Sequence, residues 1–240
     1  MTVPTLRFLP VVLFALAAGC ASTSLLPDED RVGLARDLEG KTLHLRASNH
    51  VMPFFTDSTR RLISPLPPDS IELLVDPSGH PILPGAPEDL LALGSKVRVE
   101  KVEFPTSLVV TRRPLYSPRT VPWLYLSVVG QPKSRPYVAV LRQGIKTREE
   151  FLSAVDQILC EKDPTPALDE YPPELRAAIR EKRLEPGMDT HAATLAWGRP
   201  ESIRQEWVEG VKSEVWTWPL GKRSATFRDG KLVNAAPALR

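Results

Sequence analysis

Apolar and polar positions divide the chain into parts that differ in periodicity. Residues 8–18 are almost wholly apolar, and residues 21–40 are polar and acidic with no sustained period. Between residues 41 and 143, short apolar runs alternate with turns, which is typical of β-strands. From residue 147 onward the spacing first favours helices and then strands again. We therefore expect a tether over residues 20–40, followed by two folded domains.

The stretch from residue 41 to residue 145 predicts a β-rich domain. Strands are expected at residues 42–45, 71–75, 96–104, 107–111, 123–129 and 136–141, with one helical turn at residues 88–93. The apolar phase slips by one between Val99 and Val102, and such a slip predicts a β-bulge. The apolar run at residues 123–126 predicts a strand that is covered on both faces. Short strands with Pro-rich turns favour a small barrel or a sandwich.

A helix and a linker are predicted between the two domains, over residues 146–166. Thr147 and Glu150 form a capping box at the helix start, and the break at residues 163–166 sets the domain boundary. On a helix over residues 147–161, Cys160 points away from the apolar face. Its thiol is then expected to be half buried and without a functional role. The alternative is a disulfide between two chains.

Residues 167–240 predict two helices followed by an antiparallel meander. Pro173 suits the first turn of one helix, Asp189 caps the next helix, and Gly198 ends it. Four strands follow at residues 203–208, 211–218, 224–227 and 232–233. The expected fold class is α+β, with a β-rich small barrel or sandwich domain followed by this two-helix and meander module.

Several short motifs occur together in the module. They are Ile179 in the first helix, Gly187-Met188-Asp189, Trp197-Gly198-Arg199-Pro200, Trp216-Thr217-Trp218 and Phe227-Arg228-Asp229-Gly230-Lys231-Leu232. In order and spacing they resemble the BamE / SmpA-OmlA lipoprotein family. The chain departs from the family pattern at Ala193, where valine is usual, at Asp189, where threonine is usual, and at Trp197, where leucine is usual. The preceding β-rich domain is foreign to the minimal members of the family.

Members of that family sit at the periplasmic face of the outer membrane as accessory subunits of the β-barrel assembly machine, and they contact anionic lipid. The resemblance therefore implies a binding or scaffolding role, with no catalytic residue to carry over and no cofactor. The implied partners are the membrane and an envelope protein of the outer-membrane assembly machinery.

The apolar start of the chain ends in Leu16-Ala17-Ala18-Gly19-Cys20, which resembles the lipobox of bacterial lipoproteins. Residues 8–18 fit the apolar part of a secretory signal. As a helix, at about 1.5 Å per residue, they cover only about half of a hydrocarbon core of about 30 Å, which disfavours a membrane-spanning segment. The resemblance implies that residues 1–19 are a signal peptide and that Cys20 is lipidated with diacylglycerol, palmitate included. Ala21 resembles the sorting pattern for the outer membrane.

Composition adds two constraints to this picture. Pro accounts for 25 of 240 residues, which favours rigid, extended connections over long helices. Only two cysteines occur, so no disulfide can form within the chain once Cys20 is modified. Stability is therefore expected to come from burial of a core.

The formal net charge of +2 hides an asymmetry along the chain. Residues 21–95 carry a net negative charge and residues 96–149 a net positive one, with Arg112, Arg113 and Arg119 among the basic side chains. These arginines are candidates for binding anionic lipid headgroups or acidic cell-wall polymers. The alternative is a solvated β surface whose arginines keep the protein soluble. Nucleic acid is not an expected partner of an exported, anchored chain.

Aromatic side chains supply a second candidate surface. Trp216 and Trp218 lie two residues apart on one predicted strand and therefore share a face. Together with Phe227 they are candidates for a partner-binding platform. The alternative is that they form the core between the meander and the two helices.

Sequence signatures of catalysis are absent. No metalloprotease, P-loop or Gly-x-Ser-x-Gly motif occurs, and the four histidines show no metal-ligand spacing. A carboxylate pair built from distant residues would leave no motif. We predict a non-catalytic, lipid-anchored scaffold or accessory subunit in outer-membrane protein assembly, without a metal. The alternative is an envelope module that recognises anionic lipid or cell-wall glycan through its basic β surface.

Overall fold

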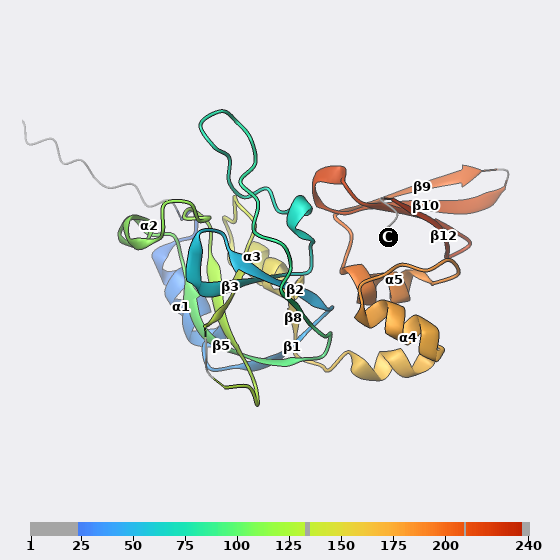
Figure 1. The fold of residues 1–240 in the computed structure, drawn as a ribbon, viewed down its shortest axis with the longest axis horizontal. Helices are drawn as coiled ribbons and strands as arrows, with labels where there is room; N and C mark the ends of the chain where they lie inside the picture. The colour runs from blue at the N-terminus through green and yellow to red at the C-terminus, as the bar shows by residue number, and fades with distance from the viewer. Residues whose placement is uncertain (1–23, 133–134, 209, 237–240) are drawn as a thin grey trace, which may run out of the picture.

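The computed structural model describes residues 24–132, 135–208 and 210–236. They form an α+β protein with two sheets, one of eight strands and one of four, each accompanied by helices (Figure 1). The helices are α1 (Asp28–Leu38), α2 (Ser107–Arg112), α3 (Arg148–Asp156), α4 (Pro173–Arg180) and α5 (Thr190–Trp197). Within the described residues no helix is both long enough and apolar enough to cross a membrane.

The eight-stranded sheet has the order β4-β2-β3-β7-β6-β5-β1-β8. Its strands are β1 (Thr42–Leu45), β2 (Asn49–Phe54), β3 (Asp57–Ser64), β4 (Asp89–Leu91), β5 (Lys96–Glu103), β6 (Trp123–Val128), β7 (Tyr137–Val140) and β8 (Leu159–Cys160). Neighbours are antiparallel except for β3 and β7, which are parallel. The sheet is therefore mixed.

This sheet coils toward itself without closing. His44 of β1 pairs with Lys96 of β5, and Asn49 of β2 pairs with Leu91 of β4, so the same register continues through the corner between the two ladders. The strands β1 and β2 thus act as one bent strand, opposite β4 and β5. Because β4 and β8 remain as edges in the described residues, this sheet is not a closed barrel, and the barrel form of the expected barrel or sandwich is wrong.

Two details of the predicted strands are confirmed. The register of β5 against β6 shifts between Val99 and Lys101, which is the expected bulge. On β6, Trp123 packs in one buried cluster while Leu124 packs in the other, so this strand is covered on both faces. The bulge lets Val99 and Val102 both reach the same core despite the slip in phase.

The interval expected to be a tether is largely helical. α1 buries Leu34 and Leu38 against the core of the first domain, and its acidic first turn complements the positive end of the helix dipole. Just after the helix, Glu39 accepts a hydrogen bond from the backbone N–H of Val102 at 2.8 Å. Residues 28–38 are therefore part of the domain rather than a spacer.

Several other local predictions are wrong. Residues 107–111 form α2 instead of a strand, because the side chain of Thr106 accepts from the N–H of Val109 and caps a short helix. The expected helical turn at residues 88–93 is the strand β4, and residues 71–75 contribute only an isolated bridge from Val75 to Pro81. The strands β2 and β3 were not predicted.

The helix before the domain boundary begins as expected and ends early. Thr147 accepts from the N–H of Glu150, as in a capping box. α3 ends at Asp156, and Cys160 lies on the short strand β8, which pairs with β1. The predicted position of Cys160 on a helix is therefore wrong.

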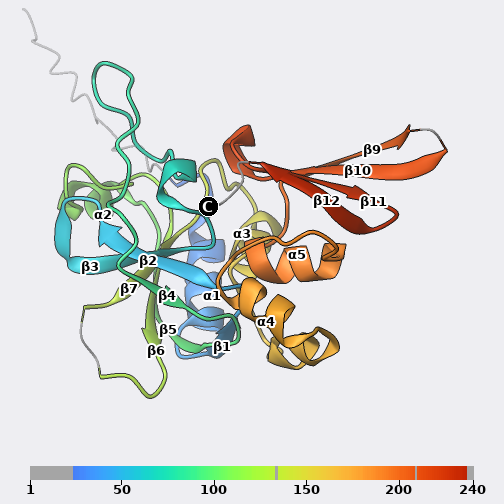
Figure 2. The ribbon, with the colours of Figure 1, turned by 45° about the vertical axis from the view of Figure 1, so that its right-hand side comes forward.

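The C-terminal domain has the predicted order of elements. Asp189 accepts from the N–H of Ala192 at 2.7 Å and begins α5, and Gly198, with φ of 83°, follows its last residue. The sheet order is β12-β11-β10-β9, wholly antiparallel, with strands β9 (Ser202–Val208), β10 (Val211–Thr217), β11 (Ser224–Arg228) and β12 (Lys231–Ala236). The helices α4 and α5 lie along one face of this sheet (Figure 2).

The two domains dock at the corner of the coiled sheet. Leu93, in that corner, is buried in the core of the C-terminal domain. The hydroxyl of Ser48 donates to the carbonyl of Arg180 at 2.8 Å and accepts from the N–H of Leu93. At the other end of the contact Lys222 binds Glu72 and the carbonyl of Asp69. The bend that shapes the first domain therefore also holds the second.

Candidate functional site

The aromatic residues expected as a platform lie in the core of the C-terminal domain. Trp216, Trp218 and Phe227 are 6%, 1% and 0% exposed, so the alternative interpretation of a core is confirmed. The ring centroids of Trp216 and Phe227 lie 4.8 Å apart. The exposed tryptophan is Trp207 on β9, at 74%. Because residues two apart on a strand share a face, the helices that cover this face of the sheet bury Trp216 and Trp218 together.

The three arginines expected to bind anions do not form one surface. The guanidinium of Arg113 is buried, donates to Glu103 at 2.9 Å and to the carbonyl of Val121 at 2.7 Å, and stacks 3.7 Å from the Trp123 ring centroid. Arg119 donates to the carbonyl of Val110 near the end of α2. Arg112 alone of the three is exposed. Arg113 and Arg119 hold the loop after α2 in place.

The electrostatics of the Arg113 contact fit a structural role. Burial by itself would raise the pKa of Glu103, but hydrogen bonds from Lys101 and Arg113 outweigh it and hold that pKa below its ordinary value. Glu103 thus stays ionised as the counter-ion of a buried guanidinium. A free anion would have to displace Glu103 to reach Arg113.

Within the described part of the chain, Cys160 and the histidines form no reactive cluster. Burial raises the pKa of the Cys160 thiol, whose Sγ lies 3.2 Å from the carbonyl oxygen of Lys162. A raised pKa makes the thiol less reactive, which favours the interpretation that Cys160 has no functional role. Cys20 lies outside the described residues, as does the whole of residues 1–19. Among the residues that the structure describes, no group of three or more His, Cys, Asp or Glu side chains is arranged to hold a metal ion.

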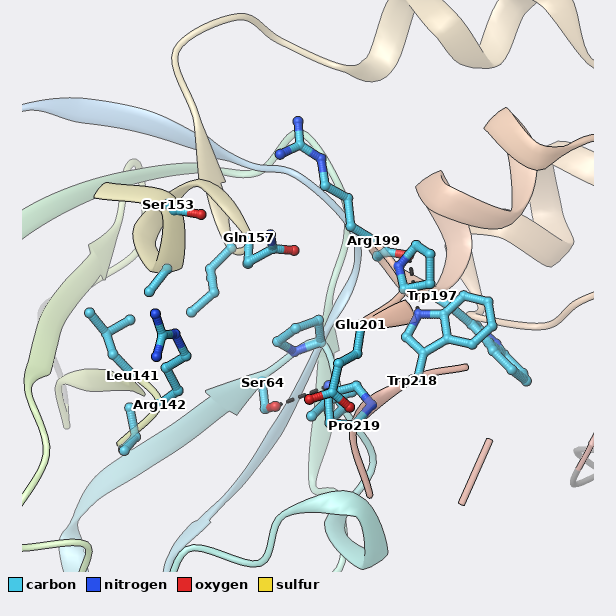
Figure 3. Close-up of a pocket in the computed structure, with 17 residues that line it drawn as sticks. Ser64, Leu141, Arg142, Ser153, Gln157, Trp197, Arg199, Glu201, Trp218 and Pro219 are labelled. Atoms are coloured by element: carbon cyan, nitrogen blue, oxygen red, sulfur yellow. Dashed lines mark hydrogen bonds between the residues drawn. The ribbon is translucent and has the colours of Figure 1, made fainter. Parts of the chain in front are cut away.

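A cleft of about 350 Å³ lies between the two domains. Its first-domain side comes from the ends of β3 and β7 and from α3, with Arg142, Ser153 and Gln157 among the lining residues. Its second-domain side is the segment from Trp197 to Glu201, together with Trp218 and Pro219. Figure 3 shows Arg142, Ser153 and Gln157 on one side of the cleft and Trp197 and Trp218 on the other.

The aromatic wall of the cleft is held rigidly. The indole Nε1 of Trp197 donates to the carbonyl of Lys182 at 2.8 Å, and that of Trp218 donates to the carbonyl of Gly198 at 3.2 Å. The two rings meet edge to face, with centroids 5.0 Å apart. Behind them the guanidinium of Arg223 lies 3.5 Å from the Trp197 centroid. Such a wall needs little ordering when a ligand binds.

Two arginines from different domains supply positive charge at the cleft. Arg142 follows β7, and its side chain is about half exposed with Glu150 at 4.0 Å. Arg199 follows α5 and donates to Asp156 at 2.6 Å, and Asp156 also binds Arg46. The carboxylate of Glu201 also lines the cleft, so the positive charge is partly balanced there. Because Glu150 is 4.0 Å from Arg142 and Arg199 shares Asp156 with Arg46, both guanidiniums can still bind an acidic group beside apolar ones.

Basic side chains are also buried deeper, where the domains meet. Arg223 and Lys182 are each 2% exposed, and Nε and Nη1 of Arg223 have no hydrogen-bond partner in the described part of the chain. Lys182 donates to the carbonyl of Ala196 at 2.8 Å, and burial lowers its pKa well below the ordinary value. The pKa of nearby His50 falls to about 4, through burial first and then repulsion by Lys182 and Arg223.

A separate apolar surface surrounds α2. Leu108, Leu115 and Tyr116 are all more than half exposed, and Leu25 is likewise exposed. Leu25 lines a shallow hollow together with Pro105, which lies two residues before the start of α2. This surface, called the α2 surface below, therefore adjoins the point where the described chain begins.

Sequence reasoning missed the cleft but had named parts of it. The segment from Trp197 to Pro200 stood out as a motif, and Arg142 belongs to the basic segment. Nothing in either stretch indicates that the end of β7 and the end of α5 face each other. That proximity results from the docking of two domains.

Comparison of the chain with protein-family models, with curated protein sequences and with solved structures finds no match.

Proposed function

We propose that this chain is a non-catalytic outer-membrane lipoprotein that binds an extended segment of an envelope protein in the cleft between its domains. It would act as a scaffold or accessory subunit in outer-membrane protein assembly, like the BamE / SmpA-OmlA family that its second domain resembles. The observation that supports this most is the cleft itself, because prolines backed by two buried, rigidly held tryptophans of one domain face Arg142 and polar side chains of the other. Cys20 would supply the anchor on the periplasmic face.

The lining of the cleft suits a polypeptide with an apolar side chain and a carboxylate. Pro65, Pro200 and Pro219 offer apolar contact in front of the buried rings of Trp197 and Trp218, while Ser153 and Gln157 offer hydrogen bonds to a peptide backbone. Arg142 and Arg199 would bind an acidic side chain or a chain end. A pocket of this mixed kind is typical of binding sites, and a binding role requires no reacting group.

The α2 surface supports attachment to a bilayer. Ser24 lies only four positions after Cys20, and at about 3.5 Å per position the chain between them spans at most about 14 Å. Lipid chains on Cys20 would therefore hold the α2 surface close to the membrane, where Leu108 and Leu115 could enter the interface and Arg112 could meet anionic headgroups. Of the three arginines considered for anion binding, this one remains available.

A second candidate is the recognition of anionic lipid or cell-wall glycan, now in the cleft rather than on a basic β surface. The two exposed arginines at the cleft favour it, because a phosphate or a carboxylate on a glycan would bind them as a peptide carboxylate does. The nature of the captured molecule distinguishes the two candidates.

Crosslinking in intact cells tests the binding role. A photoreactive amino acid at exposed Gln157 should give a discrete protein adduct, and the same group at Ser78, in a remote exposed turn, should not. Changing Arg142→Glu together with Arg199→Glu should lower the adduct yield about tenfold, whereas Arg→Lys at both positions should retain most of it. Adducts with lipid or glycan alone would favour the second candidate, and equal labelling at both positions would refute a site in the cleft.

Metabolic labelling tests the anchor. Cells fed radioactive palmitate should label the wild-type protein, and Cys20→Ser should abolish the label and release the protein into the soluble fraction. Cys160→Ser serves as the matched control and should stay labelled and membrane-bound. A wild-type protein without label would refute lipidation.

A further inference from the structure

The strand β9 leaves a long edge of the second sheet uncovered. Its residues from Ser202 to Trp207 are all exposed, and it pairs on one side only, with β10. The other sheet edges in the described residues are shorter or covered: β4 and β8 have three and two residues, and the start of β12 is bonded by Gly187 and Met188. Both views show β9 at the outer margin of the molecule (Figures 1 and 2).

Alternation along the ladder shows which residues of β9 face outward. The carbonyl of Lys212 on β10 accepts from the N–H of Asp229, so Lys212 directs its backbone groups toward β11 and away from β9. Trp207, which pairs with Lys212, therefore directs its own N–H and C=O to the free edge. By the same alternation, Gln205 and Ile203 do so as well.

The side chains of β9 are self-complementary. We propose that β9 pairs antiparallel with β9 of a second copy of this chain, with the twofold axis at Gln205. In that register Arg204 lies opposite Glu206 of the other copy, and Ile203 lies opposite its Trp207. The outward-facing residues 203, 205 and 207 then meet one another, as the hydrogen-bonded positions of an antiparallel ladder must.

Charge selects this register over its neighbours. If the twofold axis passed through Arg204, the Arg204 side chains of the two copies would lie opposite each other. If it passed through Glu206, the two Glu206 carboxylates would lie opposite each other. Like charges directly opposite each other on neighbouring strands destabilise the pair, whereas opposite charges stabilise it. Arg204 and Glu206 already lie 4.0 Å apart within one chain, so four alternating charges would gather around the axis.

Pairing through β9 joins two four-stranded sheets into one of eight strands. Ile203 and exposed Trp207 share a face and would contribute two apolar cross-strand contacts. The twofold axis uses each free edge once, so the assembly stops at a dimer. A contact built from one strand per copy is small, and we therefore expect a dimer that dissociates on dilution.

A charge swap tests the register. In sedimentation velocity of the full chain purified in detergent, Arg204→Glu and Glu206→Arg should each weaken dimerisation about tenfold or more, because each creates two like-charge pairs. The double variant Arg204→Glu/Glu206→Arg should restore the wild-type dimer, since the pairs are reformed with reversed sign. A monomeric wild type, unaffected single variants or an unrescued double variant would each overturn the proposal. Circular dichroism should show that all variants remain folded.

A disulfide test locates the axis. In a Cys160→Ala background, Gln205→Cys should form a disulfide-linked dimer in membranes under mild oxidation, because facing residues of a hydrogen-bonded pair have Cα atoms about 5.5 Å apart. The matched control is Asn234→Cys on β12, the exposed strand at the opposite edge of the same sheet. Efficient crosslinking at residue 234 and none at residue 205 would overturn the pairing through β9.

Discussion

Single side chains buried between the domains make stability depend on pH. His50 lies near buried Lys182 and Arg223, and its pKa is about 4 in the folded protein against about 6.5 in an unfolded chain. Between these two values the unfolded chain binds more protons than the folded one. The contribution of His50 to stability is thus complete above about pH 6.5 and is lost as the pH falls toward 4.

We expect the free energy of unfolding to fall between pH 7.5 and pH 5 in part because of His50. In urea titrations at both pH values, His50→Gln should reduce the loss of stability seen for the wild type, because glutamine does not titrate. His80→Gln, at an exposed turn, should leave the loss unchanged. An undiminished pH dependence in His50→Gln would contradict this assignment.

Arg113 and Arg112 are adjacent and have opposite roles, so they form a matched pair. Arg113→Ala should lower the free energy of unfolding by about 2–3 kcal/mol, because it leaves Glu103 with Lys101 alone and three backbone carbonyls without this donor. Arg112→Ala, at an exposed position, should change it by less than about 0.5 kcal/mol. Chemical denaturation checks both values, and equal effects would contradict a structural role for Arg113.

Secondary-structure elements with a local chemical signal were the ones that the sequence could predict. The capping residues Thr147 and Asp189, the bulge in β5 and the four strands of the meander each depend on neighbouring residues. The element at residues 107–112 was assigned wrongly because its two adjacent valines favour a strand, while Thr106 caps a helix between two prolines. β2 contains Pro53 and β3 carries charged residues, so neither gives the usual strand pattern.

The corner between β4 and β5 requires glycine for two reasons. Gly94 has φ of 76°, and a Cβ there would lie 2.3 Å from Cγ2 of Thr165. Gly94→Ala should therefore destabilise the protein by about 3 kcal/mol or more, through backbone strain and a clash together. Gly79→Ala has similar φ with nothing within 4 Å, and should cost only about 1 kcal/mol. The difference between the two melting curves measures the clash, and equal curves would contradict it.

At the scale of the whole molecule, the sequence predicted the two domains but not how they dock. The cleft, the buried cations and the coiled shape of the first sheet all depend on contacts between residues far apart in the chain, such as Ser48 with Arg180. The periodicity of apolar residues along the chain does not predict contacts between such distant residues. The same reason explains why Trp216 and Trp218 looked available on a strand and are buried by α4 and α5 in the fold.

Docking should make the two domains unfold together. Leu93→Ala removes a first-domain side chain from the second core, and should lower the free energy of unfolding by about 2–4 kcal/mol. Four of the five tryptophans lie in the C-terminal domain, so tryptophan fluorescence mainly reports the unfolding of that domain. For the wild type, it should follow the same denaturation curve as circular dichroism, which reports both domains. Two separated transitions in the wild type would contradict this coupling.

The insertion of Leu93 also determines what a protease can release. Trypsin cleavage after exposed Lys162 would cut the backbone between the two halves, yet Leu93 of the first fragment would still fill the core of the second. The nicked protein should migrate as one particle until a denaturant separates the pieces. If the halves were expressed separately, the first would expose Leu93 to water and the second would have a cavity in its core. Both fragments should therefore tend to aggregate.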